Sequence, residues 1–385
     1  MATHLAAASP AKGQPLELQT RPTPQPGPGE LLVLVKSVAL NPADGLMRDL
    51  GLFTPTYPTV IGFDMAGLVL EVGDGVPTSP ADAAAAGAPG LCFRPGVTRV
   101  AAHSNSYWNS VAPDYGVFQE KCLVPWQHAV PLPDDNLSWN EAATLPVATV
   151  VALNAWGTLG LTVPATKSDI DPIQPKQNKK TREAVLIWGA SSSVGTMGVQ
   201  TAALMREARD SPVAAVYATS GPANAAYVRS LGADRVFDYK DPGVVDAIVA
   251  AAREDGLVVR RCFLAMGQLA PCQAVLKVFI GDDEREGEEQ EGKGMVGSAP
   301  PLPTDAEVVE GVGTVFLVPS SEEEVRLKQF RHWMGTWLRE TLAKGLIRPS
   351  PEPRVVGKGL KDINAGLDMV LQGVSCTKLV VEIGQ

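Results

Sequence analysis

The sequence has few of the residues that bind metals or form disulfides, and it has no long apolar run. Among 385 residues there are four histidines and five cysteines, and the cysteines are scattered without a CxxC pair. An odd number of isolated cysteines is typical of reduced thiols rather than of a disulfide framework. No run reaches the roughly 18 apolar residues of a membrane helix, and the first residues do not resemble a signal peptide. We therefore expect a cytoplasmic protein without a membrane segment.

The chain also lacks an excess of basic residues. Its formal net charge of −9 disfavours a nucleic-acid partner, although a local basic pocket for a phosphorylated cofactor is compatible with it. Hydrophobic residues make up 45% of the chain and charged residues 19%, which is a globular composition. A chain of this length normally forms about two domains.

The stretch Ala184–Gln200 (AVLIWGASSSVGTMGVQ) carries the clearest functional signal. Its apolar start predicts a buried strand, which runs through a turn of small residues, Gly189–Ser193, into a helix. The free N–H groups and positive dipole at such a helix start suit a phosphate. Ala190 and Ser192 replace the first two glycines of a GxGxxG fingerprint that ends at Gly195, so an ordinary turn without a ligand is the alternative.

A second apolar strand, Val213–Thr219, follows at the distance that a βαβ unit requires. It ends in Thr219-Ser220, so no carboxylate is available there for the ribose 2′-hydroxyl of NAD(H). We therefore expect a cofactor with a 2′-phosphate, NADPH.

Strands and helices alternate through the second half of the chain and predict a mostly parallel, doubly wound sheet. The first part is mostly β, after a flexible start at MATHLAAASPAKGQ, and the tail from Pro349 is expected to complete that first domain. The fold class is α/β, with expected domains at 1–152 plus 346–385 and at 153–345. Expected loops are Asn41–Gly45, Pro77–Gly96, the polar Thr166–Arg182 and the acidic Gly281–Gly294, and Glu322–Ala343 is expected to be one helix.

Five segments in order resemble the medium-chain dehydrogenase/reductase superfamily, and within it the zinc-free quinone oxidoreductases and fungal enoyl reductases. They are NPAD at Asn41–Asp44, GFDMAGLVLEVG at Gly62–Gly73, EAATLPVA at Glu141–Ala148, WGASSSVG at Trp188–Gly195 and TSGPANAAYVRSLGADRVFDYKDP at Thr219–Pro242. The resemblance covers nearly the whole chain. It implies a GroES-like β domain that binds substrate and a Rossmann domain that binds a nicotinamide cofactor.

The resemblance also implies that no zinc is bound. Zinc alcohol dehydrogenases of the superfamily carry a cysteine at the NPAD loop and a His–Glu pair where this chain has Phe63-Asp64, and their structural zinc lobe has four cysteines where this chain has only Cys92. Zinc needs three or four nitrogen or sulfur ligands. A new site made of His103, His128 and Cys122 is the alternative.

Reduction of an activated C=C bond requires hydride at the β-carbon, donors for an enolate oxygen and an acid for the α-carbon. Asn41 matches the family position near the nicotinamide; a loop asparagine that only binds its own backbone is the equal alternative. The lysine and tyrosine that relatives place shortly after the NPxD aspartate are Leu46 and Phe53 here, and Val151 replaces a threonine that contacts the cofactor in many relatives.

Because those donors are missing, Tyr107, His103, Asp44 or water remains as the proton source. Tyr107, Trp108 and Tyr115 lie on an expected loop of the β domain, where they would either line a substrate pocket or pack against the barrel. The expected catalytic residues are Asn41, Asp44 and Tyr107.

The expected cofactor contacts lie at the helix start and at the end of the second strand. Ser220, Asn224 and Tyr239 match positions that bind the adenosine phosphate in relatives; Arg229 and Lys240 either add positive charge or are solvated. The full set is Asn41, Thr149, Ser191, Ser192, Ser193, Val194, Ser220, Asn224 and Tyr239, with no metal ligand.

The sequence thus predicts an NADPH-dependent, zinc-independent reductase of an enone, a quinone or a polyketide enoyl substrate, in fungal secondary metabolism. The expected partners are a small-molecule substrate and a polyketide synthase, and the protein is expected to be a monomer or homodimer. One alternative is a non-redox cyclase or isomerase that keeps the cofactor. Another is a binding protein stabilised by the cofactor.

Overall fold

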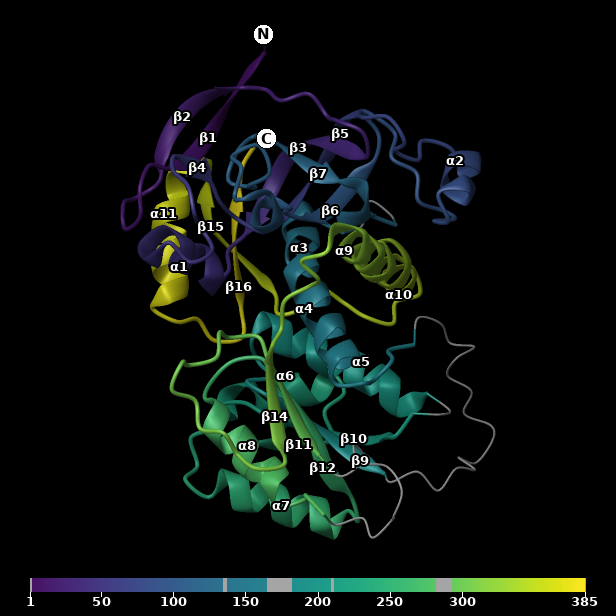
Figure 1. Ribbon diagram of the computed structural model, residues 1–385, viewed down its shortest axis with the longest axis vertical. Helices are drawn as coiled ribbons and strands as arrows, with labels where there is room; N and C mark the ends of the chain where they lie inside the picture. Colours follow the sequence, from purple (N-terminus) through teal and green to yellow (C-terminus); the bar gives the residue numbers. More distant parts are fainter. Residues whose placement is uncertain (1, 134–136, 165–181, 209–210, 282–292, 385) are drawn as a thin grey trace. The chain divides into compact units, whose positions relative to one another are not determined.

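The structure is a computed structural model that describes residues 2–133, 137–164, 182–208, 211–281 and 293–384 (Figure 1). The chain forms two units, which are described separately: unit 1 is Met1–Val150 with Ser320–Gln385, and unit 2 is Val151–Pro319. The expected insertions at Thr166–Arg182 and Gly281–Gly294 lie almost entirely outside the described residues. Among the described residues, no helix combines the length and apolar character needed to cross a bilayer.

Unit 2 is built on a six-stranded parallel sheet with the strand order β11-β10-β9-β12-β13-β14. This is the doubly wound Rossmann order, in which the first strand lies at the point where the direction of strand addition reverses. The strands are β9 (Glu183–Trp188), β10 (Val213–Thr219), β11 (Arg235–Phe237), β12 (Val258–Leu264), β13 (Gly294–Ser298) and β14 (Val312–Phe316). The fold class expected from the sequence is confirmed.

The central position of β9 follows from its composition. Every residue from Glu183 to Trp188 is buried, as expected for a parallel strand that is covered on both faces. Helix α5 contacts β9, β10 and β12, whereas α7 and α8 contact each other and β12. The helices of this unit are α5 (Ser193–Glu207), α6 (Ala225–Ser230), α7 (Val244–Glu254) and α8 (Leu269–Lys277).

Unit 1 contains two sheets, one with the strand order β2-β1-β4 and one with the order β15-β16-β3-β5-β6-β8, where β7 also pairs with β3. Its strands are β1 (Thr3–Ser9), β2 (Glu17–Pro22), β3 (Glu30–Ala39), β4 (Thr59–Val60), β5 (Asp64–Val72), β6 (Arg99–His103), β7 (Lys121–Pro125), β8 (Ala129–Pro131), β15 (Pro353–Lys358) and β16 (Lys378–Glu382). In Figure 1 the yellow β16 lies beside the purple β3, with Val380 opposite Ala39. The C-terminal tail is therefore part of unit 1.

The α-helices within unit 1 are α1 (Pro42–Leu50), α2 (Pro80–Ala85), α3 (Trp139–Ala143), α9 (Glu323–Phe330), α10 (Arg339–Ala343) and α11 (Ile363–Leu371). Helix α4 (Leu145–Thr158) begins in unit 1 and ends in unit 2. The division between the units falls within α4, after Val150. Helical backbone runs without a break from Glu323 to Ala343, as expected for Glu322–Ala343, and its central part between α9 and α10, Arg331–Leu338, is π-helical.

The structure differs from the sequence expectations at three loops. The start of the chain is not flexible, because residues 3–8 pair with residues 17–22 in β1 and β2. The segment Asn41–Gly45 is not a loop: Asn41 caps α1, and Pro42 occupies the first turn, where proline costs no hydrogen bond. Within Pro77–Gly96, α2 forms, and Phe93 is completely buried.

The segment Ser320–Gly345 also differs from expectation, since it belongs to unit 1 rather than to the Rossmann unit. Its π-helical part packs against β8 and against the short helical turn Trp126–His128. Phe330, at the end of α9, is fully buried and stacks on His128 with ring centroids 3.8 Å apart. The contacts of these aromatic side chains explain the assignment, which the alternation of strands and helices alone did not reveal.

Candidate active site

The turn between β9 and α5 is held in a tight conformation by its own small residues. Gly189 has φ +78°, and a Cβ there would lie 2.4 Å from the carbonyl oxygen of Met266. A Cβ on Gly195 would lie 2.4 Å from the carbonyl oxygen of Gly189. The Ser192 hydroxyl accepts the N–H of Gly195 at 3.1 Å and donates to the carbonyl of Gly189 at 2.8 Å. Ser192 thus caps α5 and closes the turn.

The capped turn leaves donors at the start of α5. The N–H groups of Ser193 and Val194, in the first helical turn, have no acceptor within the helix. They lie at the carboxyl end of β9, next to the reversal of strand order, where parallel sheets bind nucleotides. The close approach of backbone at Gly189 and Gly195 is the kind of cradle that a diphosphate requires, so the residues fit the diphosphate of a dinucleotide.

The neighbouring strand β10 ends beside this turn. Thr219 ties the two together, because its hydroxyl accepts the N–H of Gly189 at 2.9 Å and its carbonyl accepts the N–H of Ala190 at 2.8 Å. Ser220 follows directly, is buried, and donates its hydroxyl to the carbonyl of Gly221 at 3.2 Å. The end of β10 itself is therefore polar, since Thr219 and Ser220 contribute hydroxyls and neither is a carboxylate.

The other residues expected at this edge surround Ser220. A Cβ on Gly221 would lie 4.0 Å from Cε1 of Tyr239, so the Tyr239 ring lies close to the end of β10. Asn224 begins α6, and Lys240 Nζ lies 5.8 Å from the centre of the Tyr239 ring. Arg229 and Lys240 are exposed. Unit 2 thus brings together Ser191, Ser192, Ser193, Val194, Ser220, Asn224 and Tyr239 at one edge of the sheet.

Unit 1 contains a buried polar cluster made by Asn41, Asp44, Asp64 and Lys378, which we call the Asn41 cluster. The Asn41 side-chain nitrogen donates to Oδ2 of Asp64 at 3.0 Å and to Oδ2 of Asp44 at 3.3 Å. The Lys378 ammonium donates to Oδ1 of Asn41 at 2.5 Å and forms an ion pair with Asp64 at 3.1 Å. Asp64 also accepts the N–H of Val147, at the start of α4, at 2.7 Å.

The arrangement changes the interpretation of Asn41. Both amide hydrogens and the amide oxygen have partners within the cluster, so Asn41 organises neighbouring side chains. The alternative, a loop asparagine that binds only nearby backbone, describes one long contact, in which the side-chain nitrogen donates to the carbonyl of Ala39 at 3.4 Å.

Asp44 is the member of the Asn41 cluster whose hydrogen-bonding groups are not all used. It is completely buried, and its Oδ1 has no hydrogen-bond partner in the described part of the chain. Burial, with a smaller contribution from the charge of Asp64, raises the pKa of its carboxyl to about 7, although the Asn41 hydrogen bonds and the Lys378 charge oppose the rise. Near neutral pH this carboxyl therefore holds a proton for much of the time. Thr149, on α4, is also buried, and its hydroxyl has no hydrogen-bond partner among the described residues.

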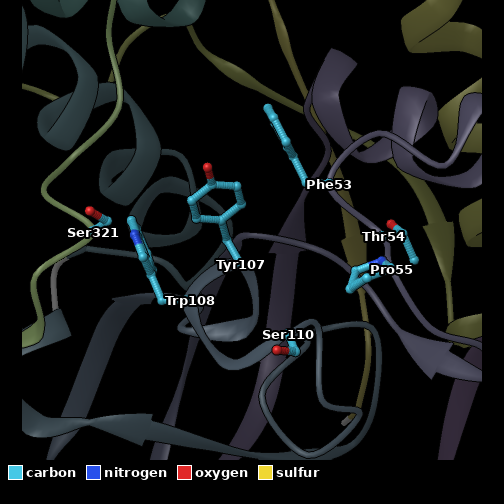
Figure 2. A pocket seen from close by; sticks show the side chains of 7 residues that line it. All are labelled: Phe53, Thr54, Pro55, Tyr107, Trp108, Ser110 and Ser321. Carbon is cyan, nitrogen blue, oxygen red and sulfur yellow. The ribbon is translucent and has the colours of Figure 1, made fainter.

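Unit 1 also contains a pocket of about 620 Å³, and three aromatic side chains form much of its wall. Figure 2 shows Phe53, Tyr107 and Trp108 projecting in the same direction from their backbones. The Phe53 and Tyr107 rings meet edge to face, with centroids 4.9 Å apart. The pocket is lined by Phe53, Thr54, Pro55, Tyr107, Trp108, Ser110 and Ser321.

Trp108 both lines the pocket and belongs to a buried aromatic cluster behind it. Its ring lies 5.6 Å from Phe330 and 5.7 Å from His128, and the Arg326 guanidinium lies 4.9 Å from its centre. Trp108 therefore fits both interpretations of this aromatic loop, because it lines the pocket and also packs in the core. Tyr115 is not among the lining residues; it donates its hydroxyl to Glu30 at 2.7 Å.

His103 and His128 lie in this aromatic cluster, with ring centroids 6.2 Å apart. Burial lowers the pKa of both imidazoles, and for His128 the neighbouring His103 and Arg326 lower it further. Within the described ranges, no group of three or more His, Cys, Asp or Glu side chains is arranged to hold a metal ion. Asp64, at the position of the zinc-ligand pair in zinc relatives, uses both oxygens within unit 1.

Two contributors to unit 1 were missed from the sequence. Lys378 lies 337 residues after Asn41, its hydrogen-bond partner, so no local pattern connects them. Arg326 lies in a segment that was assigned to the other domain. The signal that could have found Lys378 is its position at the start of an apolar strand, where a buried lysine needs a carboxylate partner.

Known proteins resemble both parts of the chain. Residues 27–134 match the family model of the alcohol dehydrogenase GroES-like domain. The trans-enoyl reductase tndF of Aspergillus flavipes is 37% identical over 383 residues, which cover 99% of each chain. The trans-enoyl reductase tazE of Aspergillus terreus is 38% identical over 329 residues, which cover 85% of this chain and 96% of the relative.

The fold is also that of a solved alcohol dehydrogenase superfamily protein from Novosphingobium aromaticivorans. The two share 21% identity with a TM-score of 0.71, and the match covers 99% of this chain and 100% of the other. The Rossmann strand order and the capped β9–α5 turn agree with this fold. The likeness to tndF over 99% of both chains identifies this chain as a member of the medium-chain dehydrogenase/reductase superfamily, in its fungal enoyl-reductase branch.

Proposed function

We propose that this protein is an NADPH-dependent, zinc-independent oxidoreductase that reduces an activated C=C bond in an enone, a quinone or a polyketide enoyl substrate. The observation that carries the proposal is the nucleotide edge of unit 2, where free helix N–H groups adjoin a strand that ends in Thr219-Ser220. The full-length similarity to proteins named trans-enoyl reductases supports the choice of an alkene over a carbonyl.

The preference for NADPH rests on charge at the end of β10. In NAD(H)-binding Rossmann units a carboxylate at this place binds the ribose hydroxyls and would repel a 2′-phosphate. Here Ser220 occupies the position, and Tyr239 lies beside it. We assign Ser193 and Val194 N–H groups to the diphosphate, and Ser220, Asn224 and Tyr239 to the 2′-phosphate.

When bound, the nicotinamide supplies hydride to the β-carbon of the substrate. The α-carbon must then gain a proton, and we assign its donation to Asp44, whose buried carboxyl is half protonated near pH 7. Asn41 holds that carboxyl in place through two hydrogen bonds. Tyr107, which lines the pocket and carries a hydroxyl, is assigned to binding of the substrate carbonyl.

The aromatic pocket is the part of unit 1 that we assign to the substrate. Flat aromatic walls favour a conjugated or extended apolar group, because such a group buries area at little conformational cost. We also propose a polyketide synthase as the protein that presents this substrate, on the similarity to trans-enoyl reductases. If so, carrier-protein-bound enoyl thioesters will be reduced with a lower KM than the same thioesters free in solution.

The nucleotide edge is tested by placing a carboxylate at its centre. Ser220→Asp should lower NADPH affinity at least about tenfold in a fluorescence titration and leave NADH affinity unchanged or improved, because it repels only the 2′-phosphate. Ser211→Asp, just before the opposite end of the same strand, is the matched control and should bind NADPH as the wild type does. Equal NADPH and NADH affinity in the wild type would contradict the cofactor assignment.

The reaction is tested with a panel of enones, quinones and enoyl thioesters. Loss of the nicotinamide absorbance together with the saturated product supports the reductase. Product formation with no absorbance change would instead select the cyclase or isomerase, the alternative raised by Leu46 and Phe53. NADPH binding with no turnover of any substrate would favour a binding protein.

A further inference from the structure

The side chain at the far end of the Asn41 cluster has no assigned role in the reaction. We propose that Lys378 is a positioning residue: its ammonium fixes the side chain of Asn41 and, through it, the carboxyl of Asp44. This inference deepens the proposed function and rests on it for the role of Asp44 as proton donor. The geometry of the cluster is independent of that role.

The first step is the orientation of the Asn41 amide. Lys378 is a pure donor and lies 2.5 Å from Oδ1 of Asn41, so the oxygen end of the amide must face it. The nitrogen end then faces the carboxylates of Asp64 and Asp44, which only accept when ionised. The reversed amide would set a donor against the ammonium and an acceptor against two carboxylates. Lys378 therefore selects one of two orientations.

The second step concerns the two oxygens of Asp44. The side-chain nitrogen and the backbone N–H of Asn41 both donate to Oδ2, at 3.3 Å and 2.7 Å. Oδ1 receives no hydrogen bond from the described residues. An oxygen that already accepts two donors is the poorer place for a proton, so the neutral carboxyl carries its proton on Oδ1. Asn41 in its selected orientation thus keeps the transferable proton on the unpartnered oxygen.

The third step is the charge balance around Asp44. Two carboxylates and one ammonium share this buried region, and Lys378 has only 5% of its side chain exposed, so its charge is weakly screened. The other charged groups nearby are engaged elsewhere: on α1, Arg48 pairs with Asp49 and with Asp368 of α11. On β6, His103 lies opposite Asp64, and burial keeps its imidazole neutral. Loss of the Lys378 charge would therefore leave the two carboxylates without their cation.

The experiment compares three substitutions at Lys378. Lys378→Met removes both the charge and the donor, Lys378→Gln keeps a donor without charge, and Lys378→Arg keeps both. Lys358→Met is the matched control, because Lys358 lies on the adjacent strand β15 and pairs at 3.4 Å with Glu382, outside the cluster. All are titrated without cofactor by infrared spectroscopy, following the neutral-carboxyl band that Asp44→Asn abolishes.

In the wild type and in Lys358→Met, the Asp44 band should titrate near pH 7. In Lys378→Met and Lys378→Gln the midpoint should rise by about one pH unit or more, because an attractive charge is gone, and Lys378→Arg should restore it. An unchanged midpoint in a folded Lys378→Met or Lys378→Gln protein would overturn the inference.

With an enone substrate, Lys378→Met should lower kcat about tenfold or more with little change in KM. The reason is that the substitution displaces the Asp44 proton donor and leaves the surface that binds substrate unchanged. Lys378→Gln should keep a larger share of kcat, since it still holds the amide. In the plot of kcat against pH for Lys378→Gln, the apparent pKa of the alkaline limb should rise by the same amount as the infrared midpoint. If Lys378 were only structural, its substitution would lower the melting temperature but leave both the alkaline pKa of kcat and the infrared midpoint unchanged.

If no substrate is reduced, the proposed function fails while the infrared titration still decides the role of Lys378. If reduction occurs but Asp44→Asn retains full kcat, the reductase assignment stands and the positioning role is refuted.

Discussion

Gly195→Ala offers the sharpest test of how the nucleotide edge is built. The new Cβ would lie 2.4 Å from the carbonyl oxygen of Gly189 and 2.8 Å from Cα of Ala190, whereas ordinary contact begins at 3.4 Å. The start of α5 and the turn must therefore separate by about an ångström. Overpacking of this kind costs about 1–3 kcal/mol, against a gain of about 1 kcal/mol from replacing glycine in a helix.

The displacement should affect binding more than stability. Ser193 and Val194 lie immediately before Gly195, so their N–H groups move with it. Loss of one hydrogen bond to a charged phosphate costs about 1.5–3 kcal/mol, which corresponds to a roughly 10- to 150-fold weaker Kd for NADPH. We expect this loss in a fluorescence titration, with a fall of no more than about 2 kcal/mol in the free energy of unfolding.

Gly157→Ala is the matched control, because Gly157 lies in α4 and its Cβ would have nothing within 4 Å. This variant should be more stable than the wild type by up to about 1 kcal/mol and should bind NADPH unchanged. If Gly195→Ala bound NADPH with wild-type affinity, the argument that a close backbone approach forms the phosphate site would be refuted.

Two further predictions concern unit 1. Burial, His103 and Arg326 lower the pKa of His128, so below about pH 6.5 the unfolded chain binds a proton that the folded chain excludes. Relative to His128→Phe, the wild type should lose up to about 1.4 kcal/mol of unfolding free energy per pH unit there, measured by urea denaturation; parallel curves would contradict this. Trp108→Ala should raise the KM for bulky conjugated substrates several-fold and leave NADPH affinity intact; an unchanged KM would remove Trp108 from the substrate site.

The Rossmann unit was predictable because its signals are local. The strand β10 was predicted at the residues that the structure gives, Val213–Thr219, because an unbroken apolar run bounded by turn residues leaves little choice. The start of α5 was predictable for the same reason: Ser192 is a preferred capping residue directly before an apolar helix.

Unit 1 was less predictable because its structure depends on distant partners. The segment THLAAAS is small and weakly apolar, and it becomes a strand only by pairing with β2 and, at Ala8, with Val60. Gly45 made Asn41–Gly45 look like a loop, but it lies inside α1, where a Cβ would lie within 2.9 Å of Leu371. Tight helix packing, rather than a turn, explains that glycine.

Only part of the Asn41 cluster could be predicted from the sequence. Asn41 and Asp44 were singled out as candidate site residues, and Asp64 was noted as a replacement for a zinc ligand. Their cation, Lys378, could not be assigned, because its contacts depend on the pairing of β16 with β3. Spacing along a chain does not encode such a contact.

That pairing has a consequence for synthesis of the protein. A ribosome releases Asn41, Asp44 and Asp64 long before Lys378 leaves the exit tunnel, since 337 residues separate Lys378 from Asn41. Until then β3 lacks one of its neighbours and two carboxylates lack their counter-charge. The nascent protein can therefore complete its Rossmann sheet during translation, but it can assemble this cluster only after β16 has emerged.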